Sequence, residues 1–242
     1  MTGINSINSI NSMDINAMAR DLELQWKEGL HRYAEALSAC VSVRLTGPRE
    51  ASGIYAHILD CLFSVPLLPP SGAVIDVGSG GGLPGVVWAI TRPDLSVTLL
   101  DSARKKCQAA QGLVSSLGLS NVSVVCRRCE EYALISREVF SLAAARAVTH
   151  AGVLCEYLSP LTKVGGRLLA FKGPKGGAEL RETESKRGDD SWTAIGLTKP
   201  EIIPYGDSDQ SRVFVIWDKK APCPARFPRR AGIAEAKKWW LT

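Results

Sequence analysis

The chain has 242 residues, of which 45% are apolar and 22% are charged, and this length and composition suit one α/β-sized domain with a sizeable core. No apolar run approaches the ~20 residues of a membrane-spanning helix, and the N-terminal stretch lacks the basic and apolar segments of a secretory signal. The seven cysteines, an odd number, are scattered along the chain, which favours reduced thiols over a disulfide framework. These features argue against a membrane-bound or secreted protein and predict a cytoplasmic one.

The first part of the chain is predicted to be helical. Residues 1–13 carry an Asn-Ser-Ile repeat and are expected to form a disordered leader. Apolar residues then recur at helical spacing through residues 14–45, which indicates one or two amphipathic helices. A second helical stretch, SGIYAHILDCLFSVPLL (52–68), ends in a proline break. We therefore assign residues 14–70 to an N-terminal helical segment.

Residues 71–218 change to an alternation of short β-rich runs and helix-length segments. The β-rich runs are AVIDV (73–77), SVTLLD (96–101), NVSVVC (121–126), VFSLAAARA (139–147) and GRLLAFKG (166–173). This alternation predicts an α/β fold with a doubly wound, mostly parallel sheet. EIIPY and SRVFVIWDK follow without a long helix between them, which suggests an antiparallel pair at the sheet edge. The polar stretch 174–198 is expected to be a loop or an irregular helix.

The turn after the first predicted strand, DVGSGGGLPG (76–85), holds four glycines in five positions. Two cofactor-binding patterns fit it: the dinucleotide pattern G-x-G-x-x-G beginning at Gly80, and D-x-G-x-G-x-G beginning at Asp76, the nucleoside-binding turn of class I methyltransferases. The second pattern fits better because Asp76 lies in the strand and Gly78 directly ends it. Glycine at positions such as Gly80 lets the backbone approach a cofactor without a Cβ clash.

The second predicted strand ends in LLDS, which places Asp101 at the ligand-binding edge of the sheet. An acid at this position can accept hydrogen bonds from both ribose hydroxyls of either cofactor. We therefore predict that Asp101 is the ribose ligand whichever pattern is used.

Cys126 and Cys129 have the C-x-x-C spacing of a zinc ligand pair. A zinc site needs a second pair of ligands, and no CxxC or HxxxH partner appears in the sequence. We therefore expect no metal site.

The C-terminal tail carries the whole excess positive charge of the chain. Residues 218–242 hold seven Lys or Arg against Asp218 and Glu235, and the other residues are neutral overall. One interpretation is a phosphate-binding arm with stacking tryptophans, and the other is a tail whose tryptophans pack back on the body. On the first interpretation, residues 219–242 bind RNA and lie apart from the nucleoside site. The cations expected to meet phosphates are Arg226, Arg229, Arg230, Lys237 and Lys238.

In order along the chain, seven stretches carry a resemblance to one family. They are HILDCL, VIDVGSGGGLPG, LLDSARKK, NVSVVCRRCEEY, AARAV, GGRLLAFKGP and FPRRAG. With these motifs the chain resembles the bacterial 16S ribosomal RNA guanine-N7 methyltransferases (RsmG, or GidB). The resemblance runs from about residue 50 to 173 and again from about 199 to the basic tail. It implies a class I methyltransferase fold, S-adenosylmethionine as cofactor, and 16S ribosomal RNA or the small ribosomal subunit as partner, with the enzyme acting as a monomer.

Residue by residue, the resemblance implies a cofactor site and a candidate catalytic group. The implied cofactor contacts are Gly78, Leu83, Asp101, Ser102, Ala103, Cys129, Glu130 and Arg146. Cys129 and Glu130 would flank the adenine, with Cys129 as a backbone contact. Arg146 would lie beside the sulfonium and the target base, which makes it the candidate catalytic residue.

The sequence after the fourth predicted strand, AARAVTH, lacks the N/D-P-P-Y/F motif common in enzymes that methylate the adenine amine. Pro222-Cys223, the one Pro-Cys pair, lies in the tail and off the sheet, so a cytosine-C5 nucleophile is not expected. Guanine N7 has an exposed lone pair, and its methylation needs alignment and water exclusion rather than a general base. His31, His57 and His150 are accordingly expected to be packing or surface residues.

Three alternatives stay open from the sequence. A class I methyltransferase could act on another substrate, although the basic tail argues against a small molecule or a protein. An NAD(P)-dependent oxidoreductase would use the G-x-G-x-x-G pattern. A non-catalytic RNA-binding module would use the basic tail and fold without a cofactor.

Overall fold

The N-terminal part of the computed structural model is helical. The structure describes residues 14–40, 43–45, 47, 49–186, 188, 190–206 and 212–241, so the expected leader lies outside the described residues. Helix α2 (Ile15–Ala39) begins at Asp14, whose carboxylate accepts hydrogen bonds from two backbone N–H groups of the first turn, and it kinks at Trp26. Helix α3 (Ala51–Leu62) and the 3₁₀ turn η1 (Val65–Leu67) follow. The prediction of helices before the sheet is confirmed.

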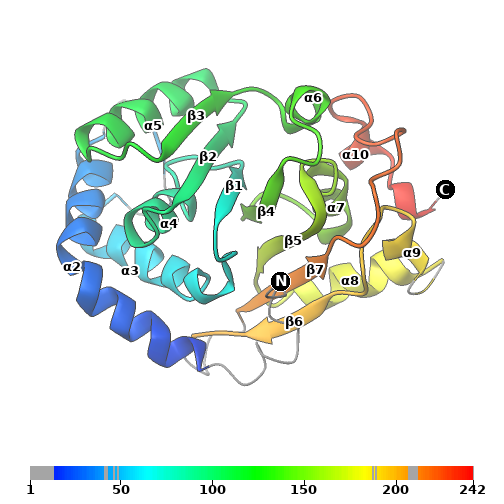
Figure 1. Cartoon of the computed structure of the whole chain (residues 1–242), viewed down its shortest axis with the longest axis horizontal. Coiled ribbons are helices and arrows are strands. Elements are labelled where there is room, and N and C mark those ends of the chain that lie inside the picture. Colours follow the sequence, from blue (N-terminus) through cyan, green and yellow to red (C-terminus); the bar gives the residue numbers. More distant parts are fainter. Residues whose placement is uncertain are drawn as a thin grey trace.

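Among the described residues, seven strands form one sheet in the order β3-β2-β1-β4-β5-β7-β6 (Figure 1). The strands are β1 (Gly72–Val77), β2 (Leu95–Asp101), β3 (Val122–Cys126), β4 (Phe140–Arg146), β5 (Thr162–Lys172), β6 (Glu201–Pro204) and β7 (Val213–Asp218). Strands β1 to β5 are parallel, and β7 lies antiparallel between β5 and β6. The predicted parallel sheet and the late antiparallel pair are both confirmed.

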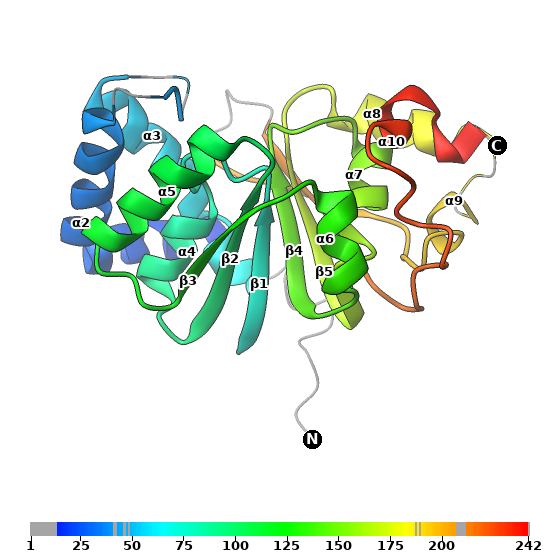
Figure 2. The same cartoon turned by 90° about the horizontal axis from the view of Figure 1, so that it is seen from above.

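Helices cover both faces of the sheet, as Figure 2 shows. Helices α2, α3, α4 (Gly85–Thr91) and α5 (Arg104–Ser116) lie on one face, and α6 (Cys129–Ile135), α7 (Ala151–Leu158) and α8 (Gly176–Glu184) lie on the other. Side chains alternate between two cores, because successive strand residues point to opposite faces. Val74 belongs to the first core and Ile75 to the second.

The stretch expected as a loop or irregular helix, residues 174–198, contains α8 and the short helix α9 (Asp190–Thr193). Trp192 of α9 is fully buried, and its indole N–H donates to the Glu184 carboxylate at 2.8 Å. A buried anchor of this kind fixes a polar segment that local pattern alone leaves undefined.

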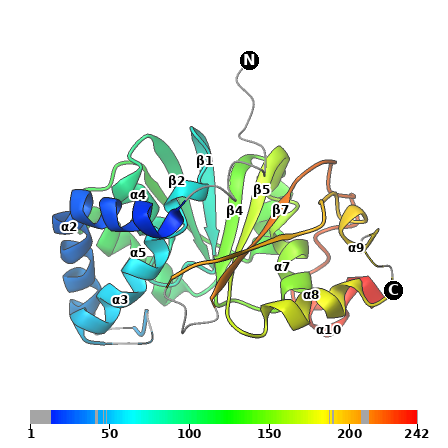
Figure 3. The ribbon, with the colours of Figure 1, turned by 90° about the horizontal axis from the view of Figure 1, so that it is seen from below.

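The C-terminal tail packs on the body of the protein. It contains α10 (Ile233–Ala236) and the 3₁₀ turn η2 (Trp239–Leu241), and both tryptophans of η2 are buried. Arg137 donates hydrogen bonds to the carbonyl groups of Cys223 and Phe227, at 2.6 and 2.8 Å. Figure 3 shows α8 and α10 on one side of the sheet and α2 and α3 on the other. Of the two interpretations of the tail, the structure has the one in which the tryptophans pack back on the body.

The parallel register brings the functional candidates to one edge of the sheet. Val77 pairs with Leu100, and Arg146 pairs with Phe171, so β1, β2, β4 and β5 all end at this edge. Ligands of doubly wound sheets bind outside the carboxyl ends of the strands. None of the helices in the described ranges has the length and apolar content needed to cross a bilayer.

Candidate functional site

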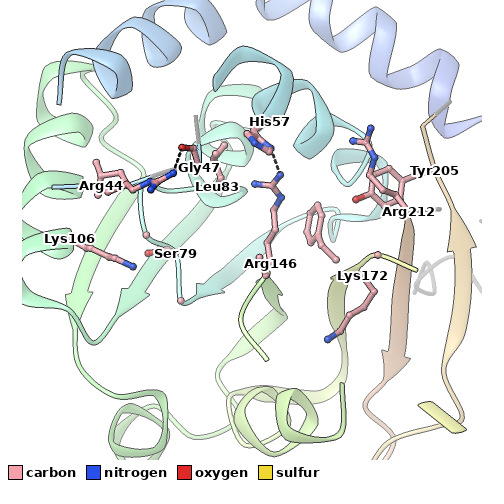
Figure 4. A pocket seen from close by; sticks show the side chains of 16 residues that line it. Arg44, Gly47, His57, Ser79, Leu83, Lys106, Arg146, Lys172, Tyr205 and Arg212 are labelled. Atoms are coloured by element: carbon pink, nitrogen blue, oxygen red, sulfur yellow. Dashed lines mark hydrogen bonds between the residues drawn. The ribbon is translucent and has the colours of Figure 1, made fainter. Parts of the chain in front are cut away.

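Two hollows open at the carboxyl edge of the sheet, and they meet at Gly78. The larger has a volume of about 680 Å³ and extends over the ends of β4 and β5 to Tyr205 and Arg212 (Figure 4). The smaller has a volume of about 120 Å³ and lies over the end of β2 and the start of α6. A ligand that crosses Gly78 would therefore contact both.

The glycine turn between β1 and α4 has a conformation that L side chains rarely adopt. Gly78 has φ +73° and Gly80 has φ +54°, and a Cβ on Gly78 would lie 2.7 Å from Cγ2 of Val148. The hydroxyl of Tyr33 in α2 donates to the carbonyl of Gly81 at 2.7 Å, so the turn is fixed from the face of the sheet that α2 covers. Gly78, Ser79, Gly80 and Leu83 line the larger hollow, so the turn exposes backbone to a ligand.

Asp76 supports this turn from inside the protein. It is fully buried, and its Oδ2 accepts a hydrogen bond from the Gly85 N–H at 2.9 Å. Burial raises the pKa of Asp76 to about 7. Its Oδ1 has no hydrogen-bond partner among the described residues, and Asp76 lines neither hollow. The acid of the D-x-G-x-G-x-G pattern therefore holds the turn and the start of α4 in place.

Asp101 ends β2 and faces the smaller hollow together with Ser102. Its Oδ2 accepts from the Gly80 N–H at 3.0 Å, and its Oδ1 accepts from the Ala103 N–H at 2.8 Å. Each carboxylate oxygen has a second lone pair, so Asp101 can still accept from two hydroxyl groups. Ala103 itself lines neither hollow, and its N–H orients Asp101.

Cys129 and Glu130 line the smaller hollow at the first turn of α6. The Cys129 thiol donates to Glu130 Oε2 at 3.3 Å, and burial raises the pKa of this thiol. A protonated, buried thiol is neither a nucleophile nor a metal ligand. In the part of the chain that the structure describes, no group of three or more His, Cys, Asp or Glu side chains could hold a metal ion.

The tail reaches the smaller hollow, which the sequence did not predict. Glu235 of α10 lines it, and the Gly232 N–H donates to Glu130 Oε1 at 3.2 Å. The expectation that the tail lies apart from the nucleoside-site residues is therefore wrong. No motif of the sequence links Gly232 or Glu235 to Glu130, because the contact depends on how the tail folds back over α7.

Arg146 leaves the end of β4 and points across the larger hollow toward α3 (Figure 4). Its Nη2 donates to Asp60 Oδ2 at 3.0 Å and lies 2.8 Å from His57 Nδ1. Since a guanidinium only donates, His57 Nδ1 must accept, and burial together with Arg146 lowers the pKa of His57. Asp60 also accepts a hydrogen bond from Arg212, the residue directly before β7. One buried carboxylate thus orients two arginines from distant parts of the chain.

Sequence reasoning missed Asp60 and Arg212, and it placed His57 among packing or surface residues. A signal for Asp60 was available, because it is a charged residue inside the otherwise apolar stretch HILDCL. The role of Asp60 depends on its partners Arg146 and Arg212, which are 86 and 152 residues away along the chain.

The larger hollow is electropositive. The cationic residues that line it are Arg44, Lys106, Arg146, Lys172 and Arg212, and no described carboxylate is among the lining residues. Lys172 Nζ donates to the Thr149 carbonyl at 2.5 Å and to Glu179 at 2.7 Å, so these two acceptors fix the position of the ammonium group. A concave surface lined by one sign of charge favours an anionic ligand such as a phosphate.

The fold and the site define a class I, S-adenosylmethionine-dependent methyltransferase. Two solved structures show this fold. One is a mutant of MtNAS in complex with S-adenosylmethionine, with a TM-score of 0.54 and 13% identity, covering 84% of this chain and 77% of that one. The other is a predicted O-methyltransferase from Agrobacterium tumefaciens, with a TM-score of 0.50 and 17% identity, covering 62% of this chain and 74% of that one.

Within this class, the chain belongs to the GidB family, described as rRNA small subunit methyltransferase G, whose model matches residues 27–194. It is 37% identical over 210 residues to the Ribosomal RNA small subunit methyltransferase G of Rubrobacter xylanophilus, which covers 84% of this chain and 80% of the relative. The protein of the same name from Clostridium perfringens is 38% identical over 223 residues, covering 90% of this chain and 87% of the relative. The family resemblance seen in the sequence is confirmed.

Proposed function

We propose that this protein transfers the methyl group of S-adenosylmethionine to N7 of a guanine in 16S ribosomal RNA, acting in the cytoplasm as a monomer. The observation that carries the proposal is the position of Arg146. It stands in an electropositive hollow that meets the nucleoside-side hollow at Gly78. A base stacked in the larger hollow would therefore come next to a methyl donor lying across the glycine turn.

The residues present fit S-adenosylmethionine along the two hollows. Gly78, Gly80 and Leu83 would contact the methionine portion and the ribose, with the open backbone of the turn facing the ligand. Asp101 would accept hydrogen bonds from the ribose hydroxyls, and Ser102 would donate one to the ribose. Ala103 would act by orienting Asp101. Cys129 and Glu130 would flank the adenine. The bound donor supplies an electrophilic methyl group on a positively charged sulfur.

The protein's contribution to the reaction is positioning. Guanine N7 forms the new bond with its own lone pair while the carbon–sulfur bond breaks, and no proton is transferred in this step. The site needs no general base, which agrees with a neutral His57 engaged by Arg146. Arg146 Nη2 is held by Asp60 and His57, and the rest of the guanidinium fork can orient the base and exclude water.

The rRNA backbone would be bound by cations at the edge of the site. Phosphate contacts of this kind fix orientation without reading sequence, so the choice of guanine rests on the hollow itself. Lys106 of α5 lines the larger hollow and is placed to meet a flanking phosphate, whereas the buried Lys172 ammonium is already paired with Glu179.

The test is mass spectrometry of the modified nucleosides in 16S rRNA from cells with and without this protein, with the purified protein added back. Naked rRNA and small subunits are each offered as substrate in separate assays, so that the comparison also identifies the preferred form. We expect 7-methylguanosine to be lost from one site without the protein and restored by it. A change in another nucleoside, or in none, would contradict the proposal. Parallel titration with NADH should show no binding.

A further inference from the structure

The C-terminal segment, defined here as Arg229–Trp240, is fastened to the body by a buried ion pair. Arg229 donates from Nε and Nη2 to the Glu156 carboxylate at 2.9 and 2.6 Å, and its backbone N–H donates to the same group at 3.0 Å. Glu156 lies in α7 and is fully buried. A buried carboxylate with three donors from one residue holds that residue in a defined place.

The end of the C-terminal segment is fixed against the start of α7. The Trp239 indole N–H donates to the Gly152 carbonyl at 2.8 Å, and a Cβ on Gly152 would lie 2.5 Å from the Trp240 ring. The Trp240 ring stacks on His150, with 5.0 Å between ring centroids. The segment is thus anchored at both ends, before and after α10.

Between these anchors, the C-terminal segment borders the smaller hollow. Figure 1 shows α10 beside α6, and the Gly232 N–H holds Glu130 Oε1 at 3.2 Å. Glu235 lines the same hollow as Asp101 and Ser102. Glu235 is exposed, so its carboxylate is available to a ligand.

We propose that the C-terminal segment is a wall of the methyl-donor pocket, and that Glu235 accepts the hydrogen bond of the adenine amino group. This proposal rests on the proposed function. A carboxylate only accepts hydrogen bonds, and the donors of an adenosine are its ribose hydroxyls and its 6-amino group. Asp101 stands at the ribose position. Glu130 is buried and accepts from the Gly232 N–H and the Cys129 thiol, whereas Glu235 is exposed and lines the hollow. Glu235 is the carboxylate left for the amino group.

Binding of two ligands to three full-length proteins tests this wall. The ligands are S-adenosylhomocysteine and S-inosylhomocysteine, whose base carries a carbonyl in place of the amino group. The proteins are the wild type, Glu235→Ala, and Glu131→Ala, a control at an exposed acid of α6 that lines neither hollow. Calorimetry measures all six affinities, and hydrogen exchange follows residues 229–241 with and without S-adenosylhomocysteine.

We expect Glu235→Ala to bind S-adenosylhomocysteine about tenfold more weakly, the loss of one charge-assisted hydrogen bond at a partly exposed site. Its affinity for S-inosylhomocysteine should not fall, so the preference for adenine shrinks, while Glu131→Ala keeps the wild-type preference. Ligand should also slow amide exchange in residues 229–241. If the wild type binds S-adenosylhomocysteine and Glu235→Ala keeps the wild-type preference for it over S-inosylhomocysteine, the proposed wall is overturned and the proposed function is not. A wild type that binds neither ligand overturns the proposed function and the wall together.

Discussion

Asp76 makes the stability of the protein depend on pH in an unusual direction. Burial raises its pKa to about 7, well above the value of a carboxyl in an unfolded chain. The folded state therefore holds a proton that the unfolded state has already lost, and stability falls as pH rises through 7. We expect Asp76 to lower the free energy of unfolding by about 1.4 kcal/mol between pH 6 and pH 8.

Denaturant unfolding of the wild type and Asp76→Asn at several pH values measures this contribution. The asparagine keeps the shape and an acceptor for the Gly85 N–H but carries no titratable group. His57 and His150 titrate in both proteins, so the difference between the two curves isolates Asp76. A difference that does not vary between pH 6 and pH 8 would show that this carboxyl titrates normally in the folded protein.

Arg146 is expected to act on the methyl-transfer step more than on cofactor binding. In Arg146→Ala, kcat should fall about a hundredfold, since the base would lose its orienting group and water would enter. The affinity for S-adenosylmethionine should change much less, because the glycine turn and Asp101 are intact. Single-turnover kinetics and calorimetry separate the two effects. Equal losses in both would place Arg146 in the cofactor pocket alone.

Asp60 is a positioning residue for Arg146, and Asp60→Asn tests this through the pattern of the loss. We expect kcat to fall while the affinity for S-adenosylmethionine stays close to that of the wild type. If Asp60 acts through Arg146, the double variant should be little slower than Arg146→Ala alone. Multiplying losses would mean that the two residues act independently. Circular dichroism checks folding, because removing one partner of a buried charge cluster destabilises the protein.

The C-terminal tail contributes to the stability of the protein through the ion pair between Arg229 and the buried Glu156. Arg229→Ala leaves the fully buried Glu156 carboxylate without its counter-charge, which should cost about 3–5 kcal/mol of unfolding free energy. Arg230→Ala, at the neighbouring exposed position, should change stability by less than about 0.5 kcal/mol. Chemical denaturation of both variants makes the comparison, and similar stabilities would refute the anchoring role of the pair.

The sheet could be predicted from the sequence because its signals are local. Each β-rich run of the parallel sheet corresponds to a strand that begins or ends within a few residues of the predicted bounds, as for SVTLLD and β2 (Leu95–Asp101). For residues 174–198 the sequence left a loop and an irregular helix open, because α8 and α9 depend on tertiary anchors such as Trp192, whose burial a polar local pattern does not reveal.

The candidate site likewise contains residues that local sequence signals reveal and residues that only tertiary contacts reveal. The glycine turn, Asp101 and Arg146 follow directly from strand ends in a parallel sheet, and the structure places them together at one edge. Asp60 and Glu235 come from segments outside that sheet, and their roles depend on long-range packing. The charge of Asp60 inside the mostly apolar stretch HILDCL is a signal in the sequence, but it does not reveal its partners, and no spacing or composition marks Glu235.

Over the whole molecule, the described cations that line the two hollows belong to the body of the protein, although the tail carries the excess positive charge of the chain. Arg104 and Lys105 are exposed in the first turn of α5, which has no acidic residue there, although cations are unfavourable at a helix N-terminus. Two tail cations, in contrast, are already paired: Arg229 with Glu156 and Lys238 with Glu182. This distribution predicts that RNA phosphates meet the α5 side of the site.

Fluorescence anisotropy of a 16S rRNA fragment at several salt concentrations tests that distribution. Replacing Arg104 and Lys105 by alanine should flatten the plot of log affinity against log salt by about 1.5–2, since each cation releases close to one counterion. Lys238→Ala, which removes a cation already paired with Glu182, should leave the slope nearly unchanged. The reverse order of effects would return the RNA contacts to the tail.

Asp60 has a consequence for how this sequence can change over time. Its carboxylate is shared by Arg146 and Arg212, which enter the chain 86 and 152 residues later. A neutral residue at position 60 leaves two facing cations, whereas the same change is mild once either arginine has been replaced. The effect of a substitution at any of the three positions therefore depends on the state of the other two. Such epistasis means that homologues should exchange these residues as a set, and that a chimaera joining the N-terminal helices of one homologue to the sheet of another should be impaired where the two parents differ at these three positions.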